Sequence, residues 1–164
     1  MHVKAKYELR RARLDFCENQ SESRVEFIIS FRAEVYDELC NVVGGWRYVK
    51  ENSCSRYYNP VHFEVGFNQE GELVDLHLCT DVPTRRIAVQ AYPDICYTQD
   101  TKKLQGESSL NNIQLNLQGW QVVTINPFSW NSMYLSSSTA RRQFLNQTFQ
   151  TMAEREEPEP VVLQ

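Results

Sequence analysis

The sequence lacks the long apolar runs and the short motifs that identify several common classes of protein. No apolar stretch approaches the roughly 20 residues of a membrane-spanning helix, and the N-terminus has no apolar core of a secretory signal. There is no GxSxG, no Walker loop and no GxGxxG. The sequence therefore indicates no membrane partner, no α/β-hydrolase nucleophile and no nucleotide-dependent kinase activity.

An excess of basic residues is also absent. The formal net charge is -4, and residues 154–159, with four glutamates and one arginine, supply -3 of it. The rest of the chain is close to neutral. Proteins that bind nucleic acid through their overall charge are usually strongly basic. The composition therefore excludes that mode of binding and leaves only a local basic patch.

Paired cysteines are missing as well. The chain has five cysteines, an odd number, at wide spacings and without a CxxC motif. Neither a disulfide framework nor a cysteine metal site follows from such a pattern. We expect reduced, mostly buried thiols and no bound metal.

The apolar periodicity that is present predicts an α/β fold with a mixed four-stranded sheet. Seven elements are expected, in the order helix 27–43, strand 61–67, strand 73–78, strand 86–92, helix 106–118, strand 120–125 and helix 139–152. The first two strands form a hairpin around the turn 68–71, and residues 51–60 form a polar loop. Ser108 or Ser109 is the expected N-cap of the second helix. The order is thus α-β-β-β-α-β-α.

Domain boundaries follow from composition. The predicted domain spans residues 26–152. Residues 1–25 mix charges with few apolar side chains and form an N-terminal extension or partial helix, with a linker at 18–23. Residues 153–164 form an acidic, proline-containing tail that we expect to be disordered.

One stretch carries a resemblance to a known family. It consists of GWQVV at 119–123, WNSM at 130–133 and the helix that follows, with Leu110, Ile113, Leu115 and Leu117 marking the helix before it. This order resembles the end of a RAP domain, the domain that closes proteins of the FAST-kinase (Fas-activated serine/threonine kinase) family. Its pattern is a G-[WY]-x-V-[VI] strand, a proline turn and W-x-x-[ML]. Here the proline, Pro127, stands one position late. The resemblance covers about residues 30–150.

RAP domains are thought to share a restriction-endonuclease-like core of the PD-(D/E)XK type, and the predicted element order agrees with it. A nuclease of this type needs acidic groups around a divalent metal. The positions that match its site are Asp75, Gln90, Tyr92 and Asn111. Three of these four are neutral, so we expect a degenerate site, with no cofactor unless a relocated nuclease site binds Mg²⁺ or Mn²⁺. Glu38, Glu64, Glu72 and Asp94 are the carboxylates that could rebuild one.

Contact with RNA is indicated by basic pairs and by tyrosines in loops or at strand ends. We expect Tyr92, Tyr97, Lys102 and Lys103 to share one side of the fold. The candidate residues are Arg85, Arg86, Tyr92, Tyr97, Lys102 and Lys103. Cations would contact phosphates, and the rings would stack on bases.

The resemblance implies an RNA-binding pseudo-nuclease domain that acts in organellar RNA processing or stability, with single-stranded RNA as partner and the mitochondrial matrix as location. Two alternatives stay open. One is a protein-interaction subunit docked in a larger ribonucleoprotein, with other organellar RNA-processing or ribosomal proteins as partners. The other is a metal-dependent endoribonuclease with relocated carboxylates.

Overall fold

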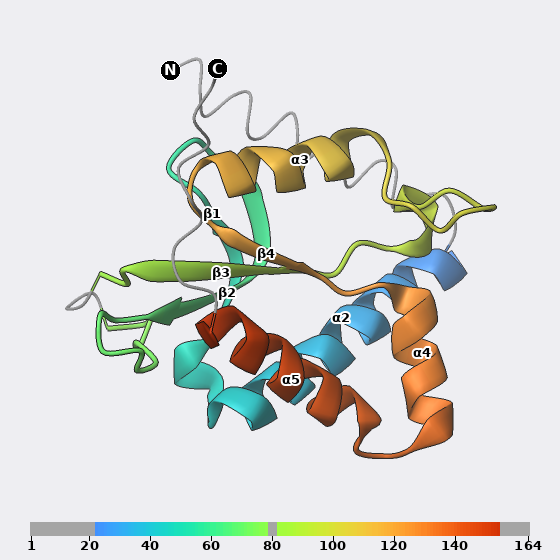
Figure 1. Ribbon diagram of the computed structural model, residues 1–164. Coiled ribbons are helices and arrows are strands. Elements are labelled where there is room, and N and C mark those ends of the chain that lie inside the picture. Colours follow the sequence, from blue (N-terminus) through green and yellow to red (C-terminus); the bar gives the residue numbers. More distant parts are fainter. Residues whose placement is uncertain (1–21, 79–81, 155–164) are drawn as a thin grey trace.

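A mixed four-stranded β-sheet lies at the centre of the protein, with helices on both faces (Figure 1). The computed structural model describes residues 22–78 and 82–154. The strands are β1 (Lys50–Cys54), β2 (Pro60–Phe67), β3 (Arg85–Gln90) and β4 (Gln121–Thr124), and they lie in the order β1-β2-β3-β4. Pairing is antiparallel except between β3 and β4, which are parallel. The predicted α/β fold with a mixed sheet is therefore confirmed.

Three helices cover one face of the sheet and a fourth covers the other (Figure 1). The first group is α2 (Glu22–Val43), α4 (Pro127–Ser136) and α5 (Ala140–Glu154), and the fourth is α3 (Gly106–Leu117). The helix α3 is the crossover that a parallel connection from β3 to β4 requires. Within the described ranges, no helix is long and apolar enough to cross a membrane.

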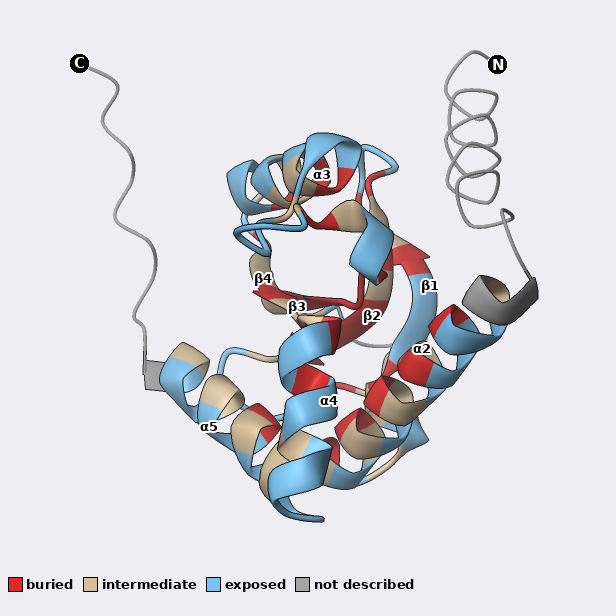
Figure 2. Cartoon of the chain, turned by 90° about the vertical axis from the view of Figure 1, so that its right-hand side faces the viewer, coloured by how far each residue is buried: buried red, intermediate tan, exposed pale blue. Residues whose placement is uncertain are grey.

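Two hydrophobic cores result from this layering. The larger core lies between the sheet and the three-helix side, where α2 contributes the stripe Phe31, Val35, Leu39 and Val43 at a spacing of four residues. The smaller core lies beneath α3 and consists of Val61, Ala88, Leu115 and Trp120. Figure 2 shows buried residues in the sheet and in the helices that pack against it. Because β3 is covered on both faces, residues 87–90 are all buried, as a central strand requires.

The predicted hairpin partner at 73–78 is wrong. Only an isolated bridge, between Phe67 and Leu73, extends the pairing beyond the turn, which is closed by a bond from the Gly71 N–H to the Asn68 carbonyl. The side chain of Asp75 then accepts hydrogen bonds from the backbone N–H groups of His77 and Leu78 and turns the chain. An Asx turn of this kind competes with strand pairing.

The fourth strand is β1, which falls in the stretch predicted to be a polar loop. It has the sequence KENSC and buries only Ser53, so it has no alternating apolar pattern. Backbone pairing with β2 holds it at the edge of the sheet, from Lys50 opposite Glu64 to Cys54 opposite Pro60. An edge strand with polar side chains cannot be detected from hydrophobic periodicity.

The helices differ from the prediction in three respects. The helix α2 begins at Glu22, inside the predicted linker, and ends before Gly44, whose φ of 89° suits glycine. The N-cap of α3 is Gln105, with no side-chain bond, so a serine cap is wrong. Between the predicted strand 120–125 and the predicted helix 139–152 lies a further helix, α4, capped by Asn126 with Pro127 in its first turn. The predicted extension before residue 22 and the tail after 154 lie outside the described residues.

Candidate functional site at the carboxyl ends of β3 and β4

The buried side chain of Gln90 forms the centre of a polar site at the end of β3. Its Oε1 accepts a hydrogen bond from the His62 N–H at 2.8 Å, and its Nε2 donates to the Pro60 carbonyl at 2.8 Å. The amide therefore satisfies one donor and one acceptor of the β2 backbone. A carboxylate could replace only the first of these bonds, because it has no hydrogen to donate.

Tyr92 and two asparagines of α3 continue the site. The Tyr92 hydroxyl donates to Asn112 Oδ1 at 3.0 Å and accepts from Asn111 Nδ2 at 2.9 Å. Asn111 Nδ2 also donates to the Pro60 carbonyl, and Asn112 Nδ2 donates to Thr124 Oγ1 on β4. Burial raises the pKa of Tyr92 to about 12, so the phenol stays protonated and neutral.

The turn between β1 and β2 contributes Asn59, which bonds to side chains in and just after α3. Asn59 Nδ2 donates to Asn111 Oδ1 at 3.1 Å and to Gln114 Oε1 at 2.6 Å, and its Oδ1 accepts from Gln118 Nε2 at 2.7 Å. We call the side chains of Asn59, Gln90, Tyr92, Asn111, Asn112, Gln114 and Gln118 the amide network. It joins β2, β3, α3 and β4 without a formal charge.

His62 on β2 lies beside the amide network. Its Nδ1 accepts a hydrogen bond from the Ala91 N–H at 2.9 Å, so in the neutral ring the proton is on Nε2. The Arg32 guanidinium lies 3.4 Å from Nε2. Burial and the charge of Arg32 hold the pKa of His62 well below its usual value. The imidazole is therefore neutral at pH 7, and its ring meets the Tyr92 ring edge to face at 4.9 Å.

A cavity of about 30 Å³ opens between these side chains and the start of α3. It has room for water but not for a nucleotide. Its lining residues are Pro60, His62, Tyr92, Glu107, Ser108, Asn111 and Gln114, so Glu107 is the single carboxylate there. In the ranges 22–78 and 82–154 no three His, Cys, Asp or Glu side chains come together as a metal site.

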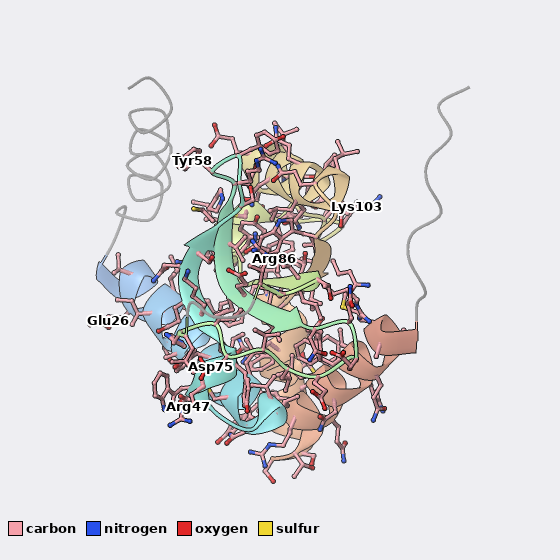
Figure 3. All side chains as sticks on the ribbon, turned by 90° about the vertical axis from the view of Figure 1, so that its left-hand side faces the viewer. Glu26, Arg47, Tyr58, Asp75, Arg86 and Lys103 are labelled. Atoms are coloured by element: carbon pink, nitrogen blue, oxygen red, sulfur yellow. The ribbon has the colours of Figure 1, made fainter. Side chains whose placement is uncertain are left out.

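The structure brings three of the four predicted nuclease positions together and leaves out the fourth. Gln90, Tyr92 and Asn111 are neighbours, whereas Asp75 lies beyond the opposite end of β2. There the Leu76 N–H donates to the Arg47 carbonyl, and Figure 3 shows Asp75 beside Arg47 and well apart from Lys103. The placement of Asp75 failed because it assumed a strand at 73–78.

The other candidate carboxylates do not converge. Glu38 pairs with Arg142 at 3.2 Å, and Glu72 bonds to Asn68 in the turn. Glu64 is buried on β2, where it accepts from the Ser53 hydroxyl and lies 3.8 Å from Arg86. Asp94 is exposed after β3 and accepts from the N–H of the next residue. Each belongs to a separate local contact.

The predicted RNA-binding residues fall into two places. Arg85 and Arg86 lie at the start of β3. Arg85 bonds to Gln121 and to the Met152 carbonyl, and Arg86 lies over the Trp120 ring at 5.4 Å (Figure 3). These arginines are engaged in internal contacts at the far end of the strand from Tyr92.

The second place is the loop after β3, where Tyr97, Lys102 and Lys103 lie near the start of α4. Lys102 Nζ is 4.3 Å from the centre of the Phe128 ring, and the Tyr97 ring meets that ring edge to face at 6.3 Å. Tyr97 is 7% exposed and Tyr92 is 4% exposed, so neither presents a face to solvent. Phe128 is 39% exposed, and the two lysines are exposed. We call Lys102, Lys103 and Phe128 the lysine–phenylalanine patch.

Sequence reasoning missed His62, Asn59 and Phe128. His62 had a usable signal, since it alternates with buried residues on the strand next to Gln90. The signal for Phe128 was its position directly after Pro127 at a helix start. The sequence around Asn59 gives no signal for its contacts with Asn111 and Gln114, which lie 52 and 55 residues further along the chain.

The fold and site together define an α/β domain with a neutral polar site at the carboxyl ends of two parallel strands. Residues 93–148 match the family model of the RAP domain, so the resemblance found in the sequence is confirmed. This segment includes α3, β4, α4 and the lysine–phenylalanine patch.

The relatives agree with this assignment. The chain is 25% identical over 151 residues to "FAST kinase domain-containing protein 1, mitochondrial" of Mus musculus, and 24% identical over 136 residues to the Homo sapiens protein of the same name. The alignments cover 80% and 70% of this chain but only 18% and 16% of those proteins. The chain thus spans about a fifth of the length of the relatives it matches. No solved structure matches it.

Proposed function

We propose that this RAP domain binds single-stranded RNA without cleaving it and acts in mitochondrial RNA processing or stability. The match to the RAP family and the relatives, which are mitochondrial proteins by name, support the cellular setting. Within the mitochondrion, the matrix is the compartment we propose, because it contains the RNA.

The amide network supports the absence of cleavage. We propose that the chain has a restriction-endonuclease-like core, supported by the order α-β-β-β-α-β and the parallel β3–β4 pair. In such a core, metal-binding carboxylates would stand near the end of β3 and on the neighbouring strand. Gln90 and His62 lie there instead, one a neutral amide and the other a neutral imidazole. A neutral amide binds hard divalent cations poorly compared with a carboxylate.

RNA binding is argued from the lysine–phenylalanine patch, and this is the observation that carries the proposal. An exposed ring with a cation over it is the combination that holds single strands, because the ring stacks on a base while lysines contact phosphates. Phe128, rather than Tyr92 or Tyr97, is the ring that would stack on a base, because both tyrosines are buried. Tyr97 supports the Phe128 ring from the side.

Fluorescence anisotropy of a labelled single-stranded RNA, titrated with the chain at two salt concentrations, tests the proposal. We expect affinity to fall with salt, and Phe128→Ala to weaken binding about tenfold, since stacking on one base is worth ~1–3 kcal/mol. Lys102→Gln with Lys103→Gln should weaken binding and flatten the salt dependence. The matched control is Lys50→Gln, an exposed lysine on β1.

Adding Mn²⁺ at the end of the titration separates binding from cleavage. A stable signal is expected. A signal that decays would indicate an active nuclease with relocated carboxylates. No binding at low salt would contradict the proposal and favour the protein-interaction alternative.

A further inference from the structure

The helix α4 presents a second exposed aromatic ring with a cation against it, in addition to Phe128. Tyr134 is 65% exposed, and the Arg141 guanidinium lies 5.0 Å from the centre of its ring. The same guanidinium lies 4.7 Å from the centre of the Trp130 ring, which is completely buried. Of the two rings that Arg141 contacts, only that of Tyr134 is open to solvent.

A hydrogen bond and an ion pair fix Arg141 in this position. Its Nε donates to the Trp130 carbonyl at 2.9 Å, and its Nη1 lies 3.0 Å from the Glu34 carboxylate on α2. Trp130 Nε1 donates to the same carboxylate at 3.2 Å. The Tyr134 ring therefore lies against a cation that is already ordered. A base that stacks on the exposed side of this ring would have little side-chain freedom to remove.

Tyr134 and Phe128 belong to one row of exposed side chains on α4. Asn131 lies between them, three residues from each, and residues three apart are neighbours on a helix surface. Such a row runs obliquely, at roughly 45° to the helix axis, and its six residues advance about 9 Å along that axis. Figure 2 shows α4 with its exposed side towards the viewer. The two rings are thus close enough to contact one strand.

We propose that Tyr134 is a second base-stacking site, and that a single strand of RNA follows α4 from the lysine–phenylalanine patch to Tyr134. The inference rests on the proposed function and extends it, because it adds a contact and gives the strand a route. The argument from chemistry is the same at both rings, since each is exposed and has a cation against it. Stacking accepts any base, so the contact at Tyr134 adds affinity without sequence preference.

The charges along this route suit a polyanion. The ten residues of α4 include no acidic or basic side chain, so no carboxylate of the helix itself repels phosphates. The two glutamates of α2 that reach the neighbouring helix are both paired, Glu34 with Arg141 and Glu38 with Arg142. At the other end of the route, the lysines of the lysine–phenylalanine patch are exposed and supply phosphate contacts.

The test is the affinity of the full chain for a labelled oligouridylate of about 12 nucleotides, measured by fluorescence anisotropy. Tyr134→Ala should weaken binding about tenfold through the loss of one stacked base. The salt dependence should not change, because the ring has no charge. Tyr134→Phe keeps the ring and should bind as the native chain does. Leu135→Ala is the matched control, because Leu135 is the next residue and is 85% exposed but has no ring.

The double variant of Phe128→Ala and Tyr134→Ala tests whether the two rings hold separate bases. Independent contacts add in free energy, so the combined loss should be about a hundredfold. The same oligonucleotide with 5-iodouridine in place of uridine gives a direct readout, because this base crosslinks under ultraviolet light to an aromatic ring stacked on it. Mass spectrometry of the native complex should find crosslinks at both Phe128 and Tyr134.

Three outcomes would each overturn the inference and leave the proposed function standing. They are a Tyr134→Ala variant that binds RNA as the native chain does while Phe128→Ala binds weakly, an equal loss of affinity in Leu135→Ala, and crosslinks at Phe128 without any at Tyr134. A native chain that binds no RNA at low salt would contradict the proposed function itself, and this inference with it.

Discussion

Replacing Gln90 by glutamate changes one nitrogen into an oxygen at the centre of the amide network. In the native chain, the Gln90 Nε2 group donates to the Pro60 carbonyl at 2.8 Å, and the side chain is completely buried. The substitution removes that donor and places a carboxylate oxygen against a carbonyl oxygen. The second bond, from the His62 N–H to Oε1, is retained.

The expected cost at pH 7 is about 3 kcal/mol of unfolding free energy. A buried donor or acceptor that loses its hydrogen-bond partner destabilises the fold by ~1–3 kcal/mol, and the cost is larger where the buried group is charged. The carboxyl group can lower this cost by binding a proton, since a protonated carboxyl can donate to the Pro60 carbonyl. Burial will therefore raise its pKa above the usual value of about 4.3.

Urea denaturation of Gln90→Glu and the native chain at several pH values between about 4.5 and 7.5 measures both effects. A group whose folded pKa is raised stabilises the fold below its unfolded pKa, and this stabilisation is lost as pH rises through the folded pKa. The deficit of the variant should thus be largest at pH 7 and shrink towards pH 4.5. Gln147→Glu, at an exposed position on α5, is the matched control and should cost little at any pH.

Two results would refute this reasoning. A Gln90→Glu variant as stable as the native chain at pH 7 would mean that Nε2 does not bond to Pro60. A large deficit that does not change with pH would mean that the carboxylate stays ionised. The ionised carboxylate would then be stabilised by a bound cation or water molecule.

Three further substitutions test separate parts of the structure by the same denaturation assay. Asn111→Ala removes bonds to three partners and should cost about 2–3 kcal/mol, whereas Asn116→Ala at an exposed position of α3 should cost almost nothing. The depressed pKa of His62 means that the neutral ring stabilises the fold above its unfolded pKa of about 6.5, so native stability should decline below that pH and His62→Gln should flatten the decline. An equal decline in both proteins would exclude His62 as its source. Gly66→Ala should cost about 1–3 kcal/mol, because the added Cβ would lie 2.7 Å from Pro83 Cβ. An unchanged denaturation midpoint would show that the segment around Pro83 moves away without cost.

Hydrophobic periodicity predicted the elements that bury an apolar stripe. β2 alternates, α2 repeats every four residues, and β3 is a continuous run between two covered faces. Each pattern reflects burial, and burial is what periodicity measures. The edge strand β1 has no apolar stripe because its place in the sheet depends on backbone pairing, so the sequence gives no signal for it.

The structure brings three of the four predicted site residues together and leaves the fourth apart. Gln90, Tyr92 and Asn111 were chosen from the resemblance, and the fold brings them together because β3 and α3 were placed correctly. Asp75 was chosen with the wrong strand, so it fell at the other end of the sheet. The neighbour that in fact lies beside Gln90 is His62 on β2, and finding it required the register between β2 and β3.

The helix α3 shows why periodicity alone could not assign its faces. Its apolar stripe predicts a helix correctly, yet the fold turns Leu110, Ile113 and Leu117 outward and buries polar residues such as Asn111. Burying amides is tolerable only when every donor and acceptor has a partner, and the amide network supplies those partners from β2, β3 and β4. The helix α3 is therefore a connector: its polar side fixes the ends of β3 and β4, and Leu110, Ile113 and Leu117 lie on its exposed side.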